Sequence, residues 1–166
     1  MSGEELLLLL LGSMVVFSIF FILIGIVAYI LGAIGLMKLA DQSGVNNGWL
    51  AFIPVANLWV VGETIRDRVM EPFNKHTGLW YLGATIALWL LEMIPYIGIL
   101  FLLTQAVIVI YVCYQLFAKF SEKAVLLTIL SVISLGLLWG FFLFAIRNNP
   151  IRKQEPAATI ETTDQI

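Results

Sequence analysis

LLLLLLGSMVVFSIFFILIGIVAYILGAIGLMKLA, residues 6–40, sets the class of this protein. The stretch has no charged side chain before Lys38, and at about 1.5 Å per residue it is longer than the ~30 Å of bilayer hydrocarbon. It predicts one long helix, tilted or protruding, that crosses a membrane over about residues 10–38. Gly44 is placed to end this helix, because glycine adopts the left-handed conformation of a helix C-terminus without strain.

Composition extends the membrane prediction to the whole chain. Of its 166 residues 61% are hydrophobic and 12% charged, whereas a soluble domain is roughly half apolar and a quarter charged. The polar residues are too few to cover a soluble surface, so a lipid bilayer is the predicted partner. The basic residues are scattered, which argues against binding to nucleic acid. The single cysteine, Cys113, cannot form a disulfide within the chain or a thiolate metal site alone.

Further apolar runs predict an all-α, polytopic fold with four transmembrane helices. Pro95 and Gly98 interrupt a long apolar run, which predicts two spans at residues 78–94 and 96–118 joined by a tight turn. A fourth span is predicted at residues 124–146. Residues 1–147 would then form one transmembrane domain. Residues 148–166, rich in Asn, Pro, Glu, Thr and Gln, are expected to be a disordered tail without a packed core.

Residues 49–70 are predicted to be a re-entrant or interfacial segment. The apolar part, residues 49–62, is too short for a comfortable crossing and contains Pro54, which suits the first position of a helix. Such a helix would place its free N–H groups and Asn57 below the lipid headgroups, where helix N-termini bind anionic groups in several transporters. The alternative, which we favour, is a helix anchored by Trp49 and Trp59 that seals the cytoplasmic face of the bundle.

Charge distribution predicts the orientation. Lys and Arg gather on the cytoplasmic side of short loops. Four spans with an outward N-terminus place six basic residues inside, which are Lys38, Arg66, Arg68, Lys75, Lys119 and Lys123. Three remain outside, which are Arg147, Arg152 and Lys153. The sequence therefore predicts both termini outside the cell, although three basic residues directly after the last span would ordinarily favour the cytoplasm.

Small residues mark two helix faces on which another helix can approach closely. The first face comprises Ser18, Gly25, Ala28, Gly32 and Gly35, and the second comprises Gly136 and Gly140 with the G-x-x-x-G spacing. Both faces suit packing within the bundle, and both suit self-association or binding of another membrane protein.

Polar residues within the spans are candidates for a pathway. Glu92 is the one acidic residue well inside a predicted span, and Thr104, Tyr111 and Gln115 share one face of the third span. Glu92 lies near the predicted outer edge, where a carboxylate reaches water, and the other three suit hydrogen bonds between helices as well as a pathway. No arrangement of residues specifies a reaction, a metal or a cofactor, and no enzyme is predicted.

One motif carries a resemblance. Its residues, in the spacing G-x4-W-x-A-x-I-P-x-x-N, are Gly44, Trp49, Ala51, Ile53, Pro54 and Asn57. The pattern resembles one in small multi-pass membrane proteins of bacteria to which no activity is assigned. The resemblance implies a bacterial plasma-membrane protein and implies no mechanism.

Two functions follow as expectations. The first is a non-enzymatic accessory protein, meaning a subunit, assembly factor or regulator that recognises another membrane protein through the small-residue faces and the embedded segment. The second is a small transporter or channel for a small solute or ion, assembled as a homo-oligomer because four helices enclose little space.

Overall fold

The computed structural model describes residues 3–152, and within that range the chain is all-α without strands. Six α-helices follow one another as α1 (Gly3–Gln42), α2 (Pro54–Thr64), α3 (Thr77–Glu92), α4 (Gly98–Phe120), α5 (Ala124–Ile133) and α6 (Trp139–Ile146). Three short 3-10 helices lie between them, which are η1 (Gly48–Phe52), η2 (Arg66–Arg68) and η3 (Phe73–His76). Two of the six α-helices, α1 and α4, are long and apolar enough to cross a membrane. The predicted disordered tail falls mostly on residues 153–166, which lie outside the described residues.

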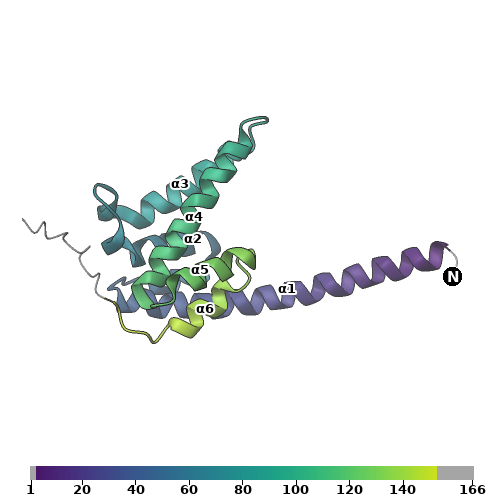
Figure 1. The fold of residues 1–166 in the computed structure, drawn as a ribbon, viewed down its shortest axis with the longest axis horizontal. Coiled ribbons are helices and arrows are strands. Elements are labelled where there is room, and N and C mark those ends of the chain that lie inside the picture. The colour runs from purple at the N-terminus through teal and green to yellow at the C-terminus, as the bar shows by residue number, and fades with distance from the viewer. Residues whose placement is uncertain (1–2, 153–166) are drawn as a thin grey trace, which may run out of the picture.

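Helix α1 confirms the long N-terminal helix and projects far beyond the rest of the molecule (Figure 1). Residues 3–23 are exposed along the whole length, while the C-terminal part from Ala28 onward is mostly packed against the body. The helix ends at Gln42, and Gly44 has a φ of 78°, as predicted for a glycine that stops a helix. The body is therefore built around the second half of α1 only.

The middle of the chain forms a short hairpin and a long one. Helix α2 begins at Pro54, as predicted, and η1 and α2 both pack against α1 and against each other. Helices α3 and α4 then form an antiparallel hairpin whose turn, residues 93–97, contains Pro95 (Figure 1). These helices match the predicted spans at 78–94 and 96–118 to within two residues. The turn is close, because a Cβ on Gly98 would collide with the Glu92 carbonyl oxygen.

The prediction of one helix over residues 124–146 is wrong. The run is divided into α5, of 10 residues, and α6, of 8 residues, with a turn over residues 134–138. The Gly136 N–H donates to the Ser131 carbonyl at 2.8 Å and the Leu135 N–H donates to the Val132 carbonyl at 3.0 Å, which is the hydrogen-bond pattern of a Schellman C-cap. Leu135 and Gly136 have φ values of 51° and 82°. At about 1.5 Å per residue neither helix alone is long enough to cross a bilayer, so the prediction of four transmembrane helices is not confirmed.

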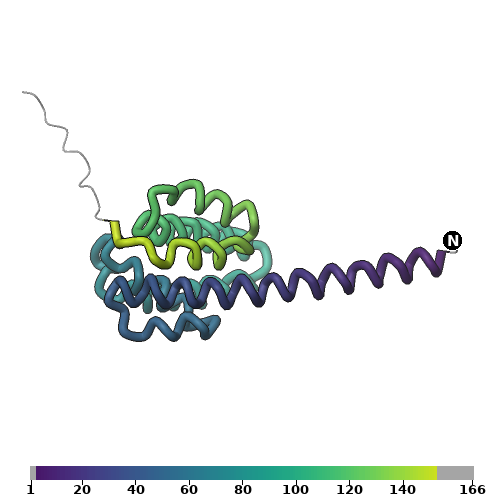
Figure 2. Tube along the Cα trace, turned by 90° about the horizontal axis from the view of Figure 1, so that it is seen from below, coloured from purple at the N-terminus to yellow at the C-terminus, as the bar shows by residue number. Residues whose placement is uncertain are grey.

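Helix α6 runs beside the second half of α1 and parallel to it (Figure 2). Contacts pair Gly32 with Gly140 and Gly35 with Leu143, so the residue numbers of the two helices rise together. The core lies between these two helices, α2 and the C-terminal half of α4, and its largest fully buried side chains include Leu36, Ile65, Phe117 and Phe120. Near it Phe117 meets the Trp139 ring edge-on, with 5.2 Å between ring centroids.

Candidate functional site

The predicted small-residue faces meet each other inside the chain over part of their length. One face of α1, with Ala28, Gly32 and Gly35, lies against Gly140, Leu143 and Phe144 of α6. A Cβ on Gly140 would collide with the Ala28 carbonyl. Backbones this close require glycine. Ser18 is exposed, and the position where Gly25 would carry a Cβ has no atom within 4 Å.

Gly136 does not belong to the predicted G-x-x-x-G face. It lies in the turn between α5 and α6 with a positive φ, and no atom lies within 4 Å of the position of its Cβ. The glycine is there for its backbone conformation, which other residues adopt only with strain. Gly140 alone contributes the predicted close helix contact.

The segment predicted to be re-entrant or interfacial contains a hairpin made by η1 and α2, with Pro54 at its tip. Pro54 is the first residue of α2, and the Asn57 side-chain amide donates to the Ala51 carbonyl at 3.1 Å, which ties the start of α2 to η1. Tyr29 of α1 donates its hydroxyl to the Phe52 carbonyl at 2.8 Å and so fixes the tip against α1. Trp49 is exposed, whereas Trp59 packs against the core beside Gly78. The segment therefore runs along α1 toward Tyr29 as η1 and returns as α2.

Of the four residues predicted to form a polar pathway, Glu92 is not brought together with the three on α4. Thr104 and Tyr111 are exposed, and the Thr104 hydroxyl donates to the Leu100 carbonyl of its own helix at 2.9 Å. Glu92 lies at the tip of the α3–α4 hairpin and Gln115 lies near the other end of α4. None of the four lines either of the two cavities described below. The adjacent residue Gln105 faces inward instead, because one residue along a helix turns the side chain by about 100°.

A cavity of about 530 Å³ lies where α2, α3, α4 and the α5–α6 turn meet. Its wall is mostly apolar and contains no charged side chain. The polar and aromatic members of the wall are Asn57, Tyr81, Thr85, Trp89, Gln105, Cys113, Ser131 and Trp139. Such a wall offers hydrogen bonds and ring faces to a guest but no counter-charge.

Two polar side chains on this wall each have a buried oxygen without a hydrogen-bond partner. Thr85 is 1% exposed and Gln105 is 9% exposed, and neither the Thr85 Oγ1 nor the Gln105 Oε1 has a partner. The other threonines of residues 3–152 all bond to a carbonyl four residues earlier, and these are Thr64, Thr77, Thr104 and Thr128. An orphaned buried polar group costs about 1–3 kcal/mol, so two on one wall are unusual. Sequence reasoning selected Thr104, the neighbour of Gln105, and missed Thr85.

A second cavity of about 530 Å³ adjoins the first between α1 and the α5–α6 turn. Asn57, Leu135, Gly136 and Trp139 line both cavities. Residues near the tip of the η1–α2 hairpin and at the tip of the α5–α6 hairpin therefore line the same two cavities. Tyr29, which holds the tip of the η1–α2 hairpin, lies roughly 20 Å along α1 from the end of that helix at Gln42.

The other ends of both hairpins gather with the ends of α1 and α4 into one polar region. Buried Lys119 donates its Nζ to the Thr64 carbonyl at 2.6 Å and to the Asp67 carboxylate at 2.5 Å. Gln42 donates to the Arg147 carbonyl at 2.8 Å, and Asn149 donates to the Phe120 carbonyl at 2.9 Å. These contacts tie α1, α2, α4 and α6 together at the same end.

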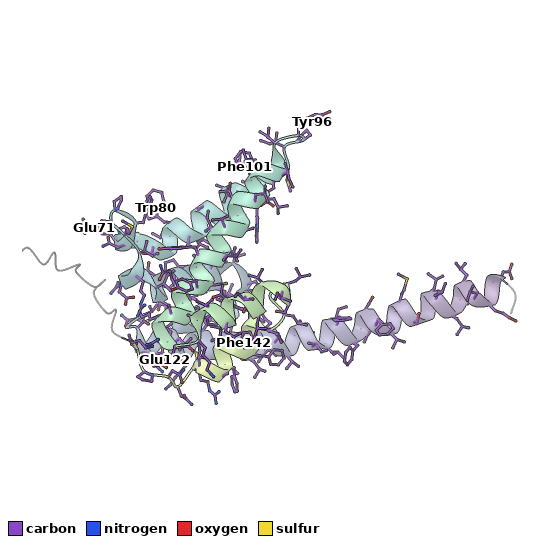
Figure 3. All side chains as sticks on the ribbon, in the orientation of Figure 1. Glu71, Trp80, Tyr96, Phe101, Glu122 and Phe142 are labelled. Carbon is purple, nitrogen blue, oxygen red and sulfur yellow. The ribbon has the colours of Figure 1, made fainter. Side chains whose placement is uncertain are left out.

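Figure 3 shows Glu71 and Glu122 at this end and Tyr96 at the opposite side of the molecule. All basic residues of the described part lie at or within about one turn of the polar end, and they are Lys38, Arg66, Arg68, Lys75, Lys119, Lys123, Arg147 and Arg152. The far side carries Glu4, Glu5 and Glu92 and no basic residue within residues 3–152. The molecule is thus strongly asymmetric in charge along its length.

Comparison of the chain with protein-family models, with curated proteins and with solved structures finds no match.

Proposed function

We propose that this chain is a non-enzymatic, multi-pass protein of the bacterial plasma membrane, and that it acts as an accessory to another membrane protein. The observation that carries the proposal is the N-terminal half of α1. Residues 3–23 form a helix that is apolar on every side after its first turn, and the rest of the described chain leaves it fully exposed. A bilayer or a partner helix is the environment in which such a surface is stable.

The proposed topology has three crossings and two re-entrant hairpins. Helices α1, α3 and α4 cross the bilayer, and α3, at about 24 Å for its 16 residues, is the shortest of them. The η1–α2 and α5–α6 hairpins enter from the polar end and return to it. Their non-helical tips line the two cavities, and non-helical backbone is tolerated at membrane depth where it lines a cavity.

The proposed orientation follows from the asymmetry of charge. The polar end with its eight described basic residues faces the cytoplasm, and the N-terminus and the turn at residues 93–97 face outward. In the four-span prediction the basic residues after α6 lay outside, against the rule. Because α5 and α6 return the chain to the side from which it came, Arg147 and Arg152 join the other basic residues in the cytoplasm.

Impermeant thiol labelling tests this topology. In a Cys113→Ser background, single cysteines replace Tyr96, Glu122 or Asn149, which are all outside the helices. We expect the cysteine at 96 to react in intact spheroplasts and those at 122 and 149 to react only after permeabilisation. A cysteine at 149 that reacts like the one at 96 would restore a fourth crossing and overturn the re-entrant α5–α6 hairpin.

The accessory function rests on the free part of α1. Its apolar stretch over residues 6–37 is about 48 Å long, well beyond the ~30 Å of bilayer hydrocarbon, and Ser18 and Gly25 leave room on one face for another helix. Close helix packing in lipid depends on small residues, because lipid tails are as apolar as leucine. A partner helix that packs on this face would explain why small residues continue beyond the intramolecular contact with α6.

Purification from the native host tests the partner. The protein is extracted in a mild detergent, and co-purifying proteins and copy number are read by mass spectrometry. We expect a stoichiometric second membrane protein, lost from the Ser18→Ile, Gly25→Ile double variant. The matched control, Val16→Ile with Val27→Ile, adds bulk to the opposite face and should retain the partner. Full recovery of the partner with both variants, or a homo-oligomer without a partner, would refute the proposal.

A second function, a small oligomeric transporter or channel, is favoured by the residues of the two hairpin tips that line the same two cavities. Broken helices that meet near the bilayer midplane form the substrate sites of several transporters. A pathway here would pass Asn57, Thr85 and Gln105 in place of the residues first predicted from sequence. Solute flux in liposomes that is unchanged by Gln105→Leu would remove this pathway.

A further inference from the structure

Two of the six buried polar side-chain atoms that lack a hydrogen-bond partner within residues 3–152 lie on one cavity wall. Thr85 comes from α3 and Gln105 from α4, and each is ten residues from Pro95 in the turn between these antiparallel helices. Equal separation from the turn of an antiparallel hairpin places the two residues at the same level. Both side chains line the 530 Å³ cavity, and both have an oxygen without a partner.

The missing partner has a defined chemistry. The Gln105 Oε1 only accepts hydrogen bonds, so its partner must donate, whereas the Thr85 hydroxyl donates and accepts. A single hydroxyl group meets both demands. A cationic or anionic group would enter a wall without a counter-charge, which is costly in a low dielectric. The partner group is therefore polar and uncharged.

The other residues of the cavity wall favour a ligand whose remaining part is apolar. The wall there includes the indole rings of Trp89 and Trp139 and the apolar side chains of Leu58, Val61, Ala106 and Val109. The volume falls in the range of roughly 300–1,000 Å³ that is usual for small-molecule sites. An apolar interior with a few convergent polar groups is the usual composition of such a site.

We propose that this cavity binds an uncharged lipid-like alcohol, with its hydroxyl between Thr85 and Gln105 and its apolar chain along the indole rings. The site goes beyond the accessory function and depends on the membrane topology only for the source of the guest, which reaches the cavity from the bilayer. A single-chain alcohol and a neutral glycerolipid such as diacylglycerol share this chemistry. Water is the competing occupant.

Photolabelling of the full-length protein in detergent tests the site. One probe is a dodecanol that carries a diazirine on its chain, and the matched probe is the same diazirine alkane without the hydroxyl. We expect the alcohol to label peptides of α3, α4 and the α5–α6 turn, saturably, and the alkane to label exposed helices without saturation. Unlabelled dodecanol and dioleoylglycerol are the competitors. The one that competes shows whether the bound lipid is a single-chain alcohol or a neutral glycerolipid.

Variants separate a binding role from a structural one. Loss of one hydrogen bond in Gln105→Leu should weaken binding of the alcohol roughly three- to tenfold. The same change removes a buried orphan acceptor, so the melting temperature should stay the same or rise. Ala106→Phe fills the cavity and should abolish saturable labelling, whereas the control Thr104→Val, on the exposed face of α4, should change neither quantity.

Three results would overturn the proposal. The first is equal labelling patterns for alcohol and alkane, which would mean that the cavity holds water or detergent only. The second is competition by neither alcohol. The third is unchanged labelling in both Gln105→Leu and Ala106→Phe. Each can occur with the partner of α1 still present, so this proposal and the accessory function fail independently.

Discussion

Replacement of Gly35 by alanine tests the close contact between α1 and α6, on which the division of residues 124–146 into two helices depends. A Cβ on Gly35 would lie 2.5 Å from the Leu143 carbonyl carbon, 2.6 Å from the Phe144 nitrogen and 2.7 Å from the Leu143 oxygen. All three atoms belong to the backbone, so no rotamer change can relieve the collision. Helix α6 would have to retreat by roughly 1 Å to restore ordinary van der Waals separation.

The loss in the free energy of unfolding caused by Gly35→Ala can be bounded. Overpacking of this kind costs about 1–3 kcal/mol, and alanine in place of glycine inside a helix offsets up to about 1 kcal/mol of it. We expect Gly35→Ala to lower the free energy of unfolding by about 1–2 kcal/mol. The matched control is Gly25→Ala, the same change ten residues earlier in the same helix, where the Cβ meets no atom within 4 Å. There only the helix propensity remains, so stability should be unchanged or higher.

Both variants can be measured by unfolding in detergent, with Cys113 as the reporter. This thiol is partly buried and is the one cysteine of the chain, so a thiol-reactive dye reports exposure of α4 on unfolding. The reasoning would be refuted if Gly35→Ala and Gly25→Ala shifted stability in the same direction by the same amount. Helix α6 would then not pack on α1, and a continuous helix over residues 124–146 would again be the better interpretation.

Three further changes can be followed with the same assay. Asp67→Ala removes the carboxylate that pairs with buried Lys119 and should cost roughly 1–2 kcal/mol, while Glu71→Ala, at an exposed position, should have little effect; equal effects would contradict the ion pair. Leu135→Gly relieves a left-handed backbone at a side chain that is 96% exposed and should stabilise by up to about 1 kcal/mol, whereas a loss of stability would show that the turn is not as described. Gly136→Ala introduces strain at a φ of 82° and should destabilise by about 1 kcal/mol, and a neutral result would argue against the break between α5 and α6.

Local signals predicted the long first helix and the start of α2. A run of apolar residues without charge can form little else than a helix in lipid, and Gly44 and Pro54 act within a turn of their own position. The α3–α4 hairpin was predicted for the same reason, because Pro95 breaks an otherwise uniform run. These features need no knowledge of distant parts of the chain.

The break between α5 and α6 could not be predicted in the same way. Leu135 has no preference for a positive φ, and Gly136 in an apolar run has the same appearance as a glycine that packs against another helix. The break is stable because Gly140 fits against Ala28 and Gly32, more than a hundred residues earlier in the chain. Ser134, which accepts from the Leu138 N–H at 3.2 Å, is the one local signal that reasoning from sequence passed over.

The candidate site was harder still to predict. Thr85 and Gln105 matter because each has a buried oxygen without a partner, and a missing partner is a property of the packed structure. Periodicity could place Thr104, Tyr111 and Gln115 on one face of α4 but could not say that Thr104 and Tyr111 would lie on the exposed side. The symmetry of Thr85 and Gln105 about Pro95 was visible in the sequence and is the signal that could have found them.

The parallel contact between α1 and α6 also sets the order in which the protein can be completed during synthesis. At roughly 5–20 residues per second, the ribosome needs about 5–20 s to extend the chain from the end of α1 at residue 42 to the end of α6 at residue 146. Throughout that interval the face of α1 that carries Gly32 and Gly35 lacks the α6 residues that cover it in the finished structure. A premature stop anywhere before residue 139 would leave the α1 face at Gly32 and Gly35 without its α6 partner.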